Sequence, residues 1–267
     1  MFCRCAENDA AQPCLSYVFL DVFDSRRRRA SYGHRVWEAG IALAIWLSLN
    51  GLDVVRGKRV LELGSGVGIA GLAASLATKG DTLLTLSDHQ EIGRYHEEFA
   101  KDTGRNLLGN IAHNAAANGV FAEVATLDWH AAIAEGGGEI GGETERGADS
   151  NEALLPAAQA QLGTFDVVLA SDCIYHQSDA SALAAAVCRH TAPGGKAVMM
   201  NRTGREGDAD ALLLEHLRAA VAAGGGTVEV EELQIVSSTF SEALQLVTVT
   251  LPVPQDGHVV EGQVVTA

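Results

Sequence analysis

The sequence predicts an α/β protein whose central sheet is doubly wound and mostly parallel, with a final antiparallel strand. Short apolar or β-branched runs alternate with longer segments of helical character, which is the order that βαβ units produce. A glycine-rich turn at 64–68 connects one such run to a helical segment. Near the C-terminus, two alternating segments follow each other with no helical pattern between them, and such strands pair most simply as antiparallel neighbours.

The first half of the chain is expected to build an N-terminal addition and one side of the sheet. A β-branched and aromatic run predicts a short strand, and the apolar segment that ends at Asn50-Gly51 predicts a buried helix. Strands and helices then alternate through the glycine turn. The predicted elements are, in order, strand 17–23, helix 36–49, strand 59–63, helix 69–78, strand 83–86, helix 106–117 and strand 124–127.

The second half begins with the segment 135–152, which is rich in Gly and Glu and has no periodicity. Such a composition cannot bury enough apolar surface to offset the entropy of ordering, so we predict a disordered insertion. The apolar run at 165–170 is typical of a strand in the middle of a parallel sheet. The predicted elements are strand 165–170, helix 180–190, a turn at Pro193–Gly195, strand 197–200, helix 208–223, and strands 228–233 and 244–250.

The elements divide the chain into one domain with two additions. We expect an N-terminal extension over residues 1–30, the domain over 31–254 with its insertion, and a C-terminal tail over 255–267. A length of 267 residues suits a single large α/β domain better than two full ones.

Composition and charge restrict the class of partner. The formal charge of −15 disfavours a partner that is held through its phosphates, so we expect no nucleic acid and favour a basic partner. No uncharged apolar run reaches the roughly 18 residues of a membrane span, and no signal-peptide pattern opens the chain. We therefore expect a location in the cytoplasm, with the nucleus as a second location, and no membrane partner. We also expect a monomer.

The sequence also contains five cysteines and one short basic run. The five cysteines are scattered and lack the paired spacing of a zinc site, so we expect free thiols and no metal. The run Arg26–Arg29 is either a basic patch, which would include a nuclear address, or a solvated turn. We favour the turn.

The glycine turn is the first feature that carries chemistry. Three glycines between a strand and a helix let the backbone approach a ligand closely and offer it free N–H groups. Gly64, Gly66 and Gly68 depart from the dinucleotide spacing, because Ile69 stands where the third glycine would fall. Asp88 ends the next strand, where a carboxylate can accept both hydroxyls of a ribose or serve as an ordinary turn residue.

Two motifs in order resemble the seven-strand S-adenosylmethionine-dependent methyltransferases. The first is an acidic residue followed by G-x-G-x-G, in 62–68, and the second is the D-x-x-Y signature, in Ser171–Tyr175. More narrowly, the chain is similar to the family-16 group, which contains many protein-lysine methyltransferases. Further stretches that match this group are Val36-Trp-Glu-Ala39, Asn110–Asn114 and Asp128-Trp129. The resemblance implies a Rossmann-like sheet of seven strands and a methyltransferase domain over 31–254.

The resemblance also implies which residues would bind the cofactor, S-adenosyl-L-methionine. The glycine motif would lie along its methionine and ribose, Asp88 would hold the ribose hydroxyls, Asp128 and Trp129 would border the adenine, and Trp37 would close the pocket. For both tryptophans, packing in the core is an equal alternative. Asn110 and Asn114 share one helix face, where hydrogen bonding within the protein competes with ligand contact. The full set is Trp37, Glu62, Gly64, Ser65, Gly66, Gly68, Asp88, Asp128, Trp129 and Ser171.

Asp172 and Tyr175 are the predicted catalytic residues, because they follow a central strand at the edge where open α/β sheets bind ligands. Methyl transfer to nitrogen needs an aligned lone pair and no metal, so Asp172 would position the amine and Tyr175 would wall its channel with a ring face. The alternative is that Asp172 caps a helix and Tyr175 packs. The resemblance thus implies an enzyme that methylates a protein side-chain nitrogen, most simply lysine.

Some features depart from the family pattern and leave alternatives open. The segment Gln90–Arg105 is long, and His176, which could act as a base or be solvated, follows Tyr175 where many relatives carry an acid. These differences fall where substrate is selected. The alternatives are a small-molecule amine or another side chain as acceptor, a non-catalytic binding module, and a nicotinamide-dependent oxidoreductase, against which the glycine spacing and the successive final strands both argue.

Overall fold

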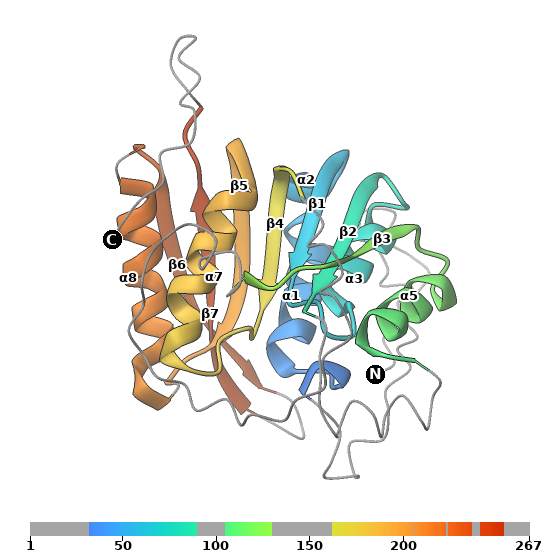
Figure 1. The fold of residues 1–267 in the computed structure, drawn as a ribbon, viewed down its shortest axis with the longest axis horizontal. Helices are drawn as coiled ribbons and strands as arrows, with labels where there is room; N and C mark the ends of the chain where they lie inside the picture. The colour runs from blue at the N-terminus through green and yellow to red at the C-terminus, as the bar shows by residue number, and fades with distance from the viewer. Residues whose placement is uncertain are drawn as a thin grey trace, which may run out of the picture.

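The central feature of the computed structural model is one seven-stranded sheet with the order β3-β2-β1-β4-β5-β7-β6 (Figure 1). The structure describes residues 32–89, 105–129, 162–204, 206–222, 224–236 and 241–253. The first five strands in this order, from β3 through β2, β1 and β4 to β5, pair in parallel. Strand β7 pairs antiparallel with both β5 and β6. The predicted fold class is therefore confirmed. The strands are β1 Lys58–Leu63, β2 Thr82–Asp88, β3 Ala122–Thr126, β4 Phe165–Ser171, β5 Thr191–Arg202, β6 Thr227–Val236 and β7 Ser241–Thr250.

The strand order reverses between β1 and β4, which lie side by side although more than a hundred residues separate them in the sequence. From β1 the chain continues outward to β2 and β3, and from β4 it continues to β5 on the other side. In open α/β sheets, ligands bind beyond the carboxyl ends of the strands at such a reversal. The topology thus places the glycine turn after β1 beside Asp172, which follows β4.

The helices cover the two faces of the sheet in separate groups. One core cluster joins α1, α3 and α5 to side chains such as Val60, Leu86 and Leu169, and the other joins α7 and α8 to side chains such as Leu61 and Val168. This alternation along the strands follows from the two-residue period of a β-strand. The helices are α1 Glu38–Leu49, α2 Leu52–Val55, α3 Ile69–Ala77, α5 Leu107–Ala117, α7 Gln177–His190 and α8 Ala209–Ala222, with the 3₁₀ turns η1 Tyr32–His34 and η2 Glu206–Asp208.

Two helix boundaries differ from the predicted ones by two residues or more, for identifiable reasons. Helix α1 begins at Glu38 instead of residue 36, because Trp37 has an extended backbone at the N-cap position. Helix α7 begins at Gln177, three residues before the predicted start at 180, because the side chain of Asp179 accepts hydrogen bonds from the backbone N–H groups of Tyr175 and His176. That pair of bonds satisfies donors that a helix start leaves free. The short elements α2, η1 and η2 were not predicted.

Strand β5 is longer than expected and includes the predicted Pro193–Gly195 turn. The register along β4 shifts at this point, so the Pro-Gly-Gly sequence forms an irregularity inside the strand. Gly194 has a φ of +75°, and a Cβ on Gly195 would lie 2.9 Å from the carbonyl oxygen of Asp166 on β4. The glycines therefore allow the two strands to stay in contact where a turn was expected.

Several predictions fall outside the described residues: the strand at 17–23, the run Arg26–Arg29, the segment 90–104, the insertion at 135–152 and the first three cysteines. Within the described ranges, Cys173 and Cys188 are free thiols, as expected. No helix in this part of the chain is long and apolar enough to cross a membrane.

Candidate functional site

The glycine turn after β1 has a backbone that only glycine adopts easily. Gly64, Gly66 and Gly68 have φ angles of +57°, +55° and +81°, in the left-handed region. A Cβ on Gly64 would lie 2.7 Å from the sulfur of Cys173, and one on Gly66 would lie 3.2 Å from the carbonyl oxygen of Gly33. The turn is therefore held between the segment after β4 and the segment before α1, with its backbone close to both.

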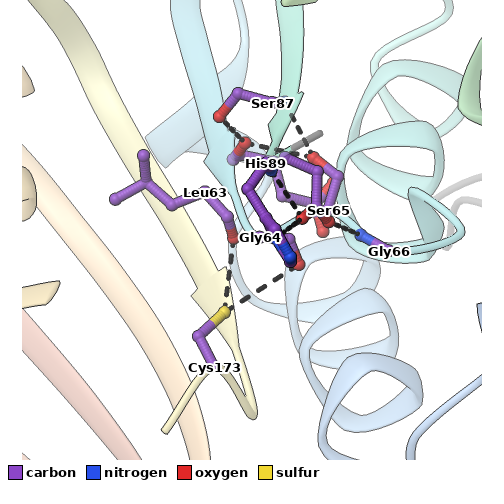
Figure 2. Close-up of polar contacts among 9 residues, drawn as sticks. Leu63, Gly64, Ser65, Gly66, Ser87, His89 and Cys173 are labelled. Atoms are coloured by element: carbon purple, nitrogen blue, oxygen red, sulfur yellow. Dashed lines mark hydrogen bonds and ion pairs between the residues drawn. The ribbon is translucent and has the colours of Figure 1, made fainter. Parts of the chain in front are cut away.

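Ser65 in the turn and Ser87 on β2 fix the shape of this turn (Figure 2), together with Asp88 at the end of β2. The backbone N–H of Ser65 donates to the carbonyl of Ser87, and the Ser65 hydroxyl accepts from the N–H of Ser87 at 3.0 Å. Asp88 accepts from the backbone N–H of Gly66 at 2.7 Å through one oxygen and from the N–H of His89 through the other. Asp88 thus lies against the glycine turn, and its contact with a ribose stays a prediction.

Glu62 lies beneath the turn and not along its open side. The side chain is 1% exposed, and its Oε2 accepts from the backbone N–H of Gly71 in α3 at 2.9 Å. Burial raises the pKa of this carboxyl to about 8, with a smaller contribution from the negative charge of Asp88. The acid of the motif therefore connects β1 to the start of α3, and its predicted contact with cofactor stays a prediction.

The helix after β2 contributes two buried asparagines on one face. Asn114 donates from its side chain to the carbonyl of Val67 at 2.9 Å, so it supports the glycine turn from the α5 side. Asn110, one helical turn closer to the carboxyl edge of the sheet, is fully buried, and neither atom of its side-chain amide has a hydrogen-bond partner. Buried amides are normally satisfied, so the Asn110 amide is available to a polar ligand or a water molecule.

Cys173 and Trp129 pack against Gly64 from the opposite side. The Cys173 thiol lies 3.4 Å from the carbonyl oxygen of Leu63 and contacts that of Gly64 (Figure 2). Burial raises the pKa of this thiol well above its ordinary value, so Cys173 stays protonated and donates to these carbonyls. A Cβ added to Gly64 would lie 3.0 Å from the Trp129 ring. Trp129 and Asp128 are both partly buried. Ser171, at the end of β4, lies near Gly40 of α1.

Asp172 has an unusual backbone and a charged partner. Its φ is +54°, its exposure is 2%, and its N–H donates to the carbonyl of Met200 on β5. The carboxylate Oδ2 lies 3.3 Å from Nε of Arg202, at the end of β5. The interpretation of Asp172 as a helix cap is wrong, because Asp179 caps α7. Aspartate and asparagine are the side chains that best tolerate this backbone region.

Two guanidinium groups lie over the ring of Trp37. The Cζ atom of Arg35 lies 4.8 Å from the ring centroid, and that of Arg202 lies 5.6 Å from it. Arg202 therefore connects Trp37, at the start of α1, to Asp172, after β4. Tyr175, three residues further on, is 42% exposed, so it does not pack in the core. His176 occupies the N-cap position of α7.

The structure brings the glycine turn, Asp88, Trp129 and Asp172 together at the carboxyl edge of β1, β2 and β4, and it adds two residues that the sequence analysis missed. Ser87 shapes the glycine turn, and Arg202 pairs with Asp172. Both end or nearly end a parallel strand, which was an available signal for Arg202, a basic residue two positions after the apolar run of β5. The predicted strand ends at residue 200, two residues before Arg202.

The residues fit the adenosyl cofactor that the motifs imply. Gly64, Gly66 and Gly68 carry no side chain, the Asp88 carboxylate accepts from the N–H of Gly66, and Asn110 offers a buried amide without a partner. Glu62, Gly64, Gly66, Gly68 and Asp88 all come from β1, β2 and the turn between β1 and α3. Among the described residues there is no group of His, Cys, Asp and Glu side chains that could hold a metal ion.

Residues 19–138 match the model of a family described as lysine methyltransferase. Curated relatives include EEF1A lysine methyltransferase 3 of Mus musculus, 32% identical over 29% of this chain and 33% of the relative. Another is protein N-terminal and lysine N-methyltransferase EFM7 of Yarrowia lipolytica (strain CLIB 122 / E 150), 23% identical over 62% of this chain and 55% of the relative. The chain thus spans about half or less of the length of these relatives.

The crystal structure of TrmN from Thermus thermophilus has a similar fold. Its TM-score is 0.50 at 13% identity, over 79% of this chain and 48% of that one, which is a likeness of fold alone. Sheet order and family match agree with the resemblance that the two sequence motifs indicate. The chain is therefore similar to the lysine methyltransferase family over residues 19–138 and has the seven-strand α/β fold of S-adenosylmethionine-dependent methyltransferases.

Proposed function

We propose that the protein is an S-adenosylmethionine-dependent N-methyltransferase that modifies a protein side chain, with lysine as the acceptor. The observation that carries the proposal is the meeting of the glycine turn, with Asp88, and the segment Asp172–Tyr175 at the point where the strand order reverses. The relatives whose names include lysine methylation support lysine as the acceptor.

In this proposal, the two halves of the site have separate tasks. The turn and Asp88 hold the cofactor, which supplies a methyl group already activated on a sulfonium. Asp172 and Tyr175 orient the acceptor, whose nitrogen lone pair forms the N–C bond as the S–C bond breaks. Alignment at close range is the main contribution that such a displacement needs from the protein. The tyrosine ring, 42% exposed, suits a channel wall because aromatic faces tolerate cationic methylated nitrogen.

The finer properties of the partner belong to the same proposal. The formal charge of −15 supports a basic protein client. We expect the protein to be a monomer that is located in the cytoplasm, with the nucleus as a second location. Light scattering on the purified chain tests the monomer, and imaging of a tagged chain tests the location.

The test is transfer of a labelled methyl group to proteins in a cell lysate, followed by separation on a gel and mass spectrometry. We expect a discrete band with the wild type, no band with Asp172→Asn, and an unchanged band with Asp166→Asn. Asp166 is a suitable control because its carboxylate accepts from the N–H of Arg59, at the amino ends of β4 and β1. Asparagine also keeps the backbone that residue 172 requires.

Calorimetry with S-adenosylhomocysteine separates the two parts of the proposal. If both aspartate variants bind S-adenosylhomocysteine and only Asp172→Asn loses methyl transfer, the assignments of the cofactor and of the acceptor site are both supported. A wild-type rate in Asp172→Asn would contradict the acceptor site. Absence of saturable binding by the wild type would overturn the cofactor, and binding without any labelled protein would point to a small-molecule amine or a binding module.

A further inference from the structure

We propose that Arg202 is a positioning residue that holds Asp172 and Trp37 together and neutralises the Asp172 carboxylate, so that the acceptor nitrogen is received without its proton. The inference rests on the proposed function, because it concerns the acceptor side of that same site. It adds a residue and an electrostatic role that neither of the two sequence motifs includes.

The first support is the position of the guanidinium between two walls of the site. Arg202 ends β5, its Nε lies 3.3 Å from Oδ2 of Asp172, and its Cζ lies 5.6 Å from the centre of the Trp37 ring. The side chain is 29% exposed and the Asp172 side chain is 1% exposed, so solvent screens the pair only on the Arg202 side. A planar guanidinium can pair with a carboxylate and stack on an aromatic ring at once, which an ammonium group does less well.

The second support is that Asp172 is held firmly where the guanidinium meets it. The N–H of Asp172 donates to Met200, whose strand neighbour two residues on is Arg202 itself. The left-handed backbone of Asp172, with φ of +54°, persists because the surrounding structure determines it. Both partners of the ion pair therefore come from the paired ends of β4 and β5.

The charge balance follows from this geometry. A buried carboxylate without a cation would stabilise a lysine ammonium, and an ammonium has no lone pair for attack. The other acids near the glycine turn, Glu62 and Asp88, accept hydrogen bonds from the backbone N–H groups of Gly71 and Gly66. Arg202 offsets the negative charge of Asp172, so the carboxylate can orient the nitrogen without retaining its proton.

A pair of cofactor analogues tests this role without a known client. In sinefungin, a carbon that bears an amino group replaces the methylated sulfur, so a cation stands at the transfer position. S-adenosylhomocysteine has no such charge. The measurement is the ratio of the two dissociation constants by calorimetry at neutral pH, for the wild type, Arg202→Met, Arg202→Lys and the double variant Arg202→Met/Asp172→Asn.

Arg202→Met should improve the affinity for sinefungin relative to that for S-adenosylhomocysteine by about tenfold, because the Asp172 carboxylate attracts the ammonium more strongly without the charge of Arg202. Arg202→Lys keeps the charge and should keep the wild-type ratio, and the double variant should return to it. Arg59→Met is the matched control, because Arg59 lies over the Phe165 ring at the amino edge of the sheet.

The outcomes separate the inference from the function on which it rests. A ratio in Arg202→Met within about twofold of the wild type, with both analogues bound, would overturn the role of Arg202 and leave the proposed function intact. If neither analogue binds the wild type, the proposed function itself fails. If Arg202→Met is poorly folded by thermal melting, Arg202→Gln takes its place, with the same expected direction and the same contradicting result.

Discussion

Glu62 is the residue whose chemistry differs most from what its motif position suggests. Its carboxyl is buried under α3 and accepts from the N–H of Gly71, and burial raises its pKa from 4.5 to about 8. At neutral pH the folded protein therefore holds this acid mainly in its protonated form. The acid that opens the motif acts first as a structural connection between β1 and α3.

This raised pKa predicts how stability depends on pH. Between pH 4.5 and 8, the unfolded chain loses the Glu62 proton while the folded chain keeps it, so the free energy of unfolding falls as pH rises. Below that window and above it, Glu62 contributes no slope. The slope from this residue is at most about 1.4 kcal/mol per pH unit. Glu62→Gln, which can still accept from Gly71, should remove it.

The measurement is urea unfolding of the wild type and Glu62→Gln at pH 5, 6.5 and 8. The variant should gain stability relative to the wild type at each step. Glu123→Gln, on the exposed side of β3, serves as the control and should follow the wild-type curve. Parallel curves for the wild type and Glu62→Gln would show that the Glu62 carboxyl ionises in the folded state.

Tyr175 makes a second prediction at the scale of one residue. Its ring is 42% exposed, so we expect it to act on the acceptor and not on the core. Tyr175→Ala should lower methyl transfer by about tenfold with little change in melting temperature, because a cation on an aromatic face is stabilised by about 1 kcal/mol or more. Tyr175→Phe keeps the ring and should keep most of the rate. Equal loss in both variants would instead assign the role to the hydroxyl.

At the scale of elements, the contact of α3 with β1 and β2 depends on one glycine. A Cβ on Gly71 would lie 2.7 Å from Oε2 of Glu62 and 2.7 Å from Cδ2 of Leu86. Because these neighbours are buried, the helix cannot admit a methyl group without moving away from the sheet. The first turn of α3 therefore approaches the sheet closely, directly after the glycine turn.

Gly71→Ala should destabilise the protein by about 1 kcal/mol or more, even though alanine is the better helix former by about 1 kcal/mol. Chemical denaturation measures the effect. Gly109→Ala, in the first turn of α5, is the control, because its Cβ would meet only the side chains of Asn106 and Arg105, at 3.1 Å or more. Stabilisation in both variants would show that α3 has room to shift.

The elements were predictable where one periodic pattern determines them, and less so where distant contacts do. Helix α3, bounded by Gly68, and the final strands followed from local sequence. The start of α7 depends on the cap by Asp179, and the course of β5 depends on its pairing with β4. In the site, a strand end predicted Asp88 and the D-x-x-Y motif predicted Asp172, but the partner Arg202 comes from another strand and needs the register to be known.

At the scale of the whole molecule, the sheet divides the candidate site into two halves. Strands β1 and β2 supply the turn and Asp88, and β4 and β5 supply Asp172 and Arg202. The halves meet through Cys173, whose thiol contacts the carbonyls of Leu63 and Gly64. Occupation of the cofactor half should therefore stabilise the folded chain as a unit, because a ligand that binds only the folded state shifts the unfolding equilibrium.

This linkage predicts that S-adenosylhomocysteine at about a hundred times its dissociation constant adds about 2.7 kcal/mol, or about 5–10 °C in melting temperature. Gly66→Arg should abolish the shift in melting temperature, because the arginine side chain would start 3.2 Å from the Gly33 carbonyl oxygen and fill the space beside the glycine turn. Gly80→Arg has a similar left-handed φ of +79° but open space around it, so it separates backbone strain from obstruction and should keep the shift. Differential scanning fluorimetry measures all three proteins. A full shift in Gly66→Arg would mean that the cofactor binds elsewhere, since obstruction at the turn could then not reach it.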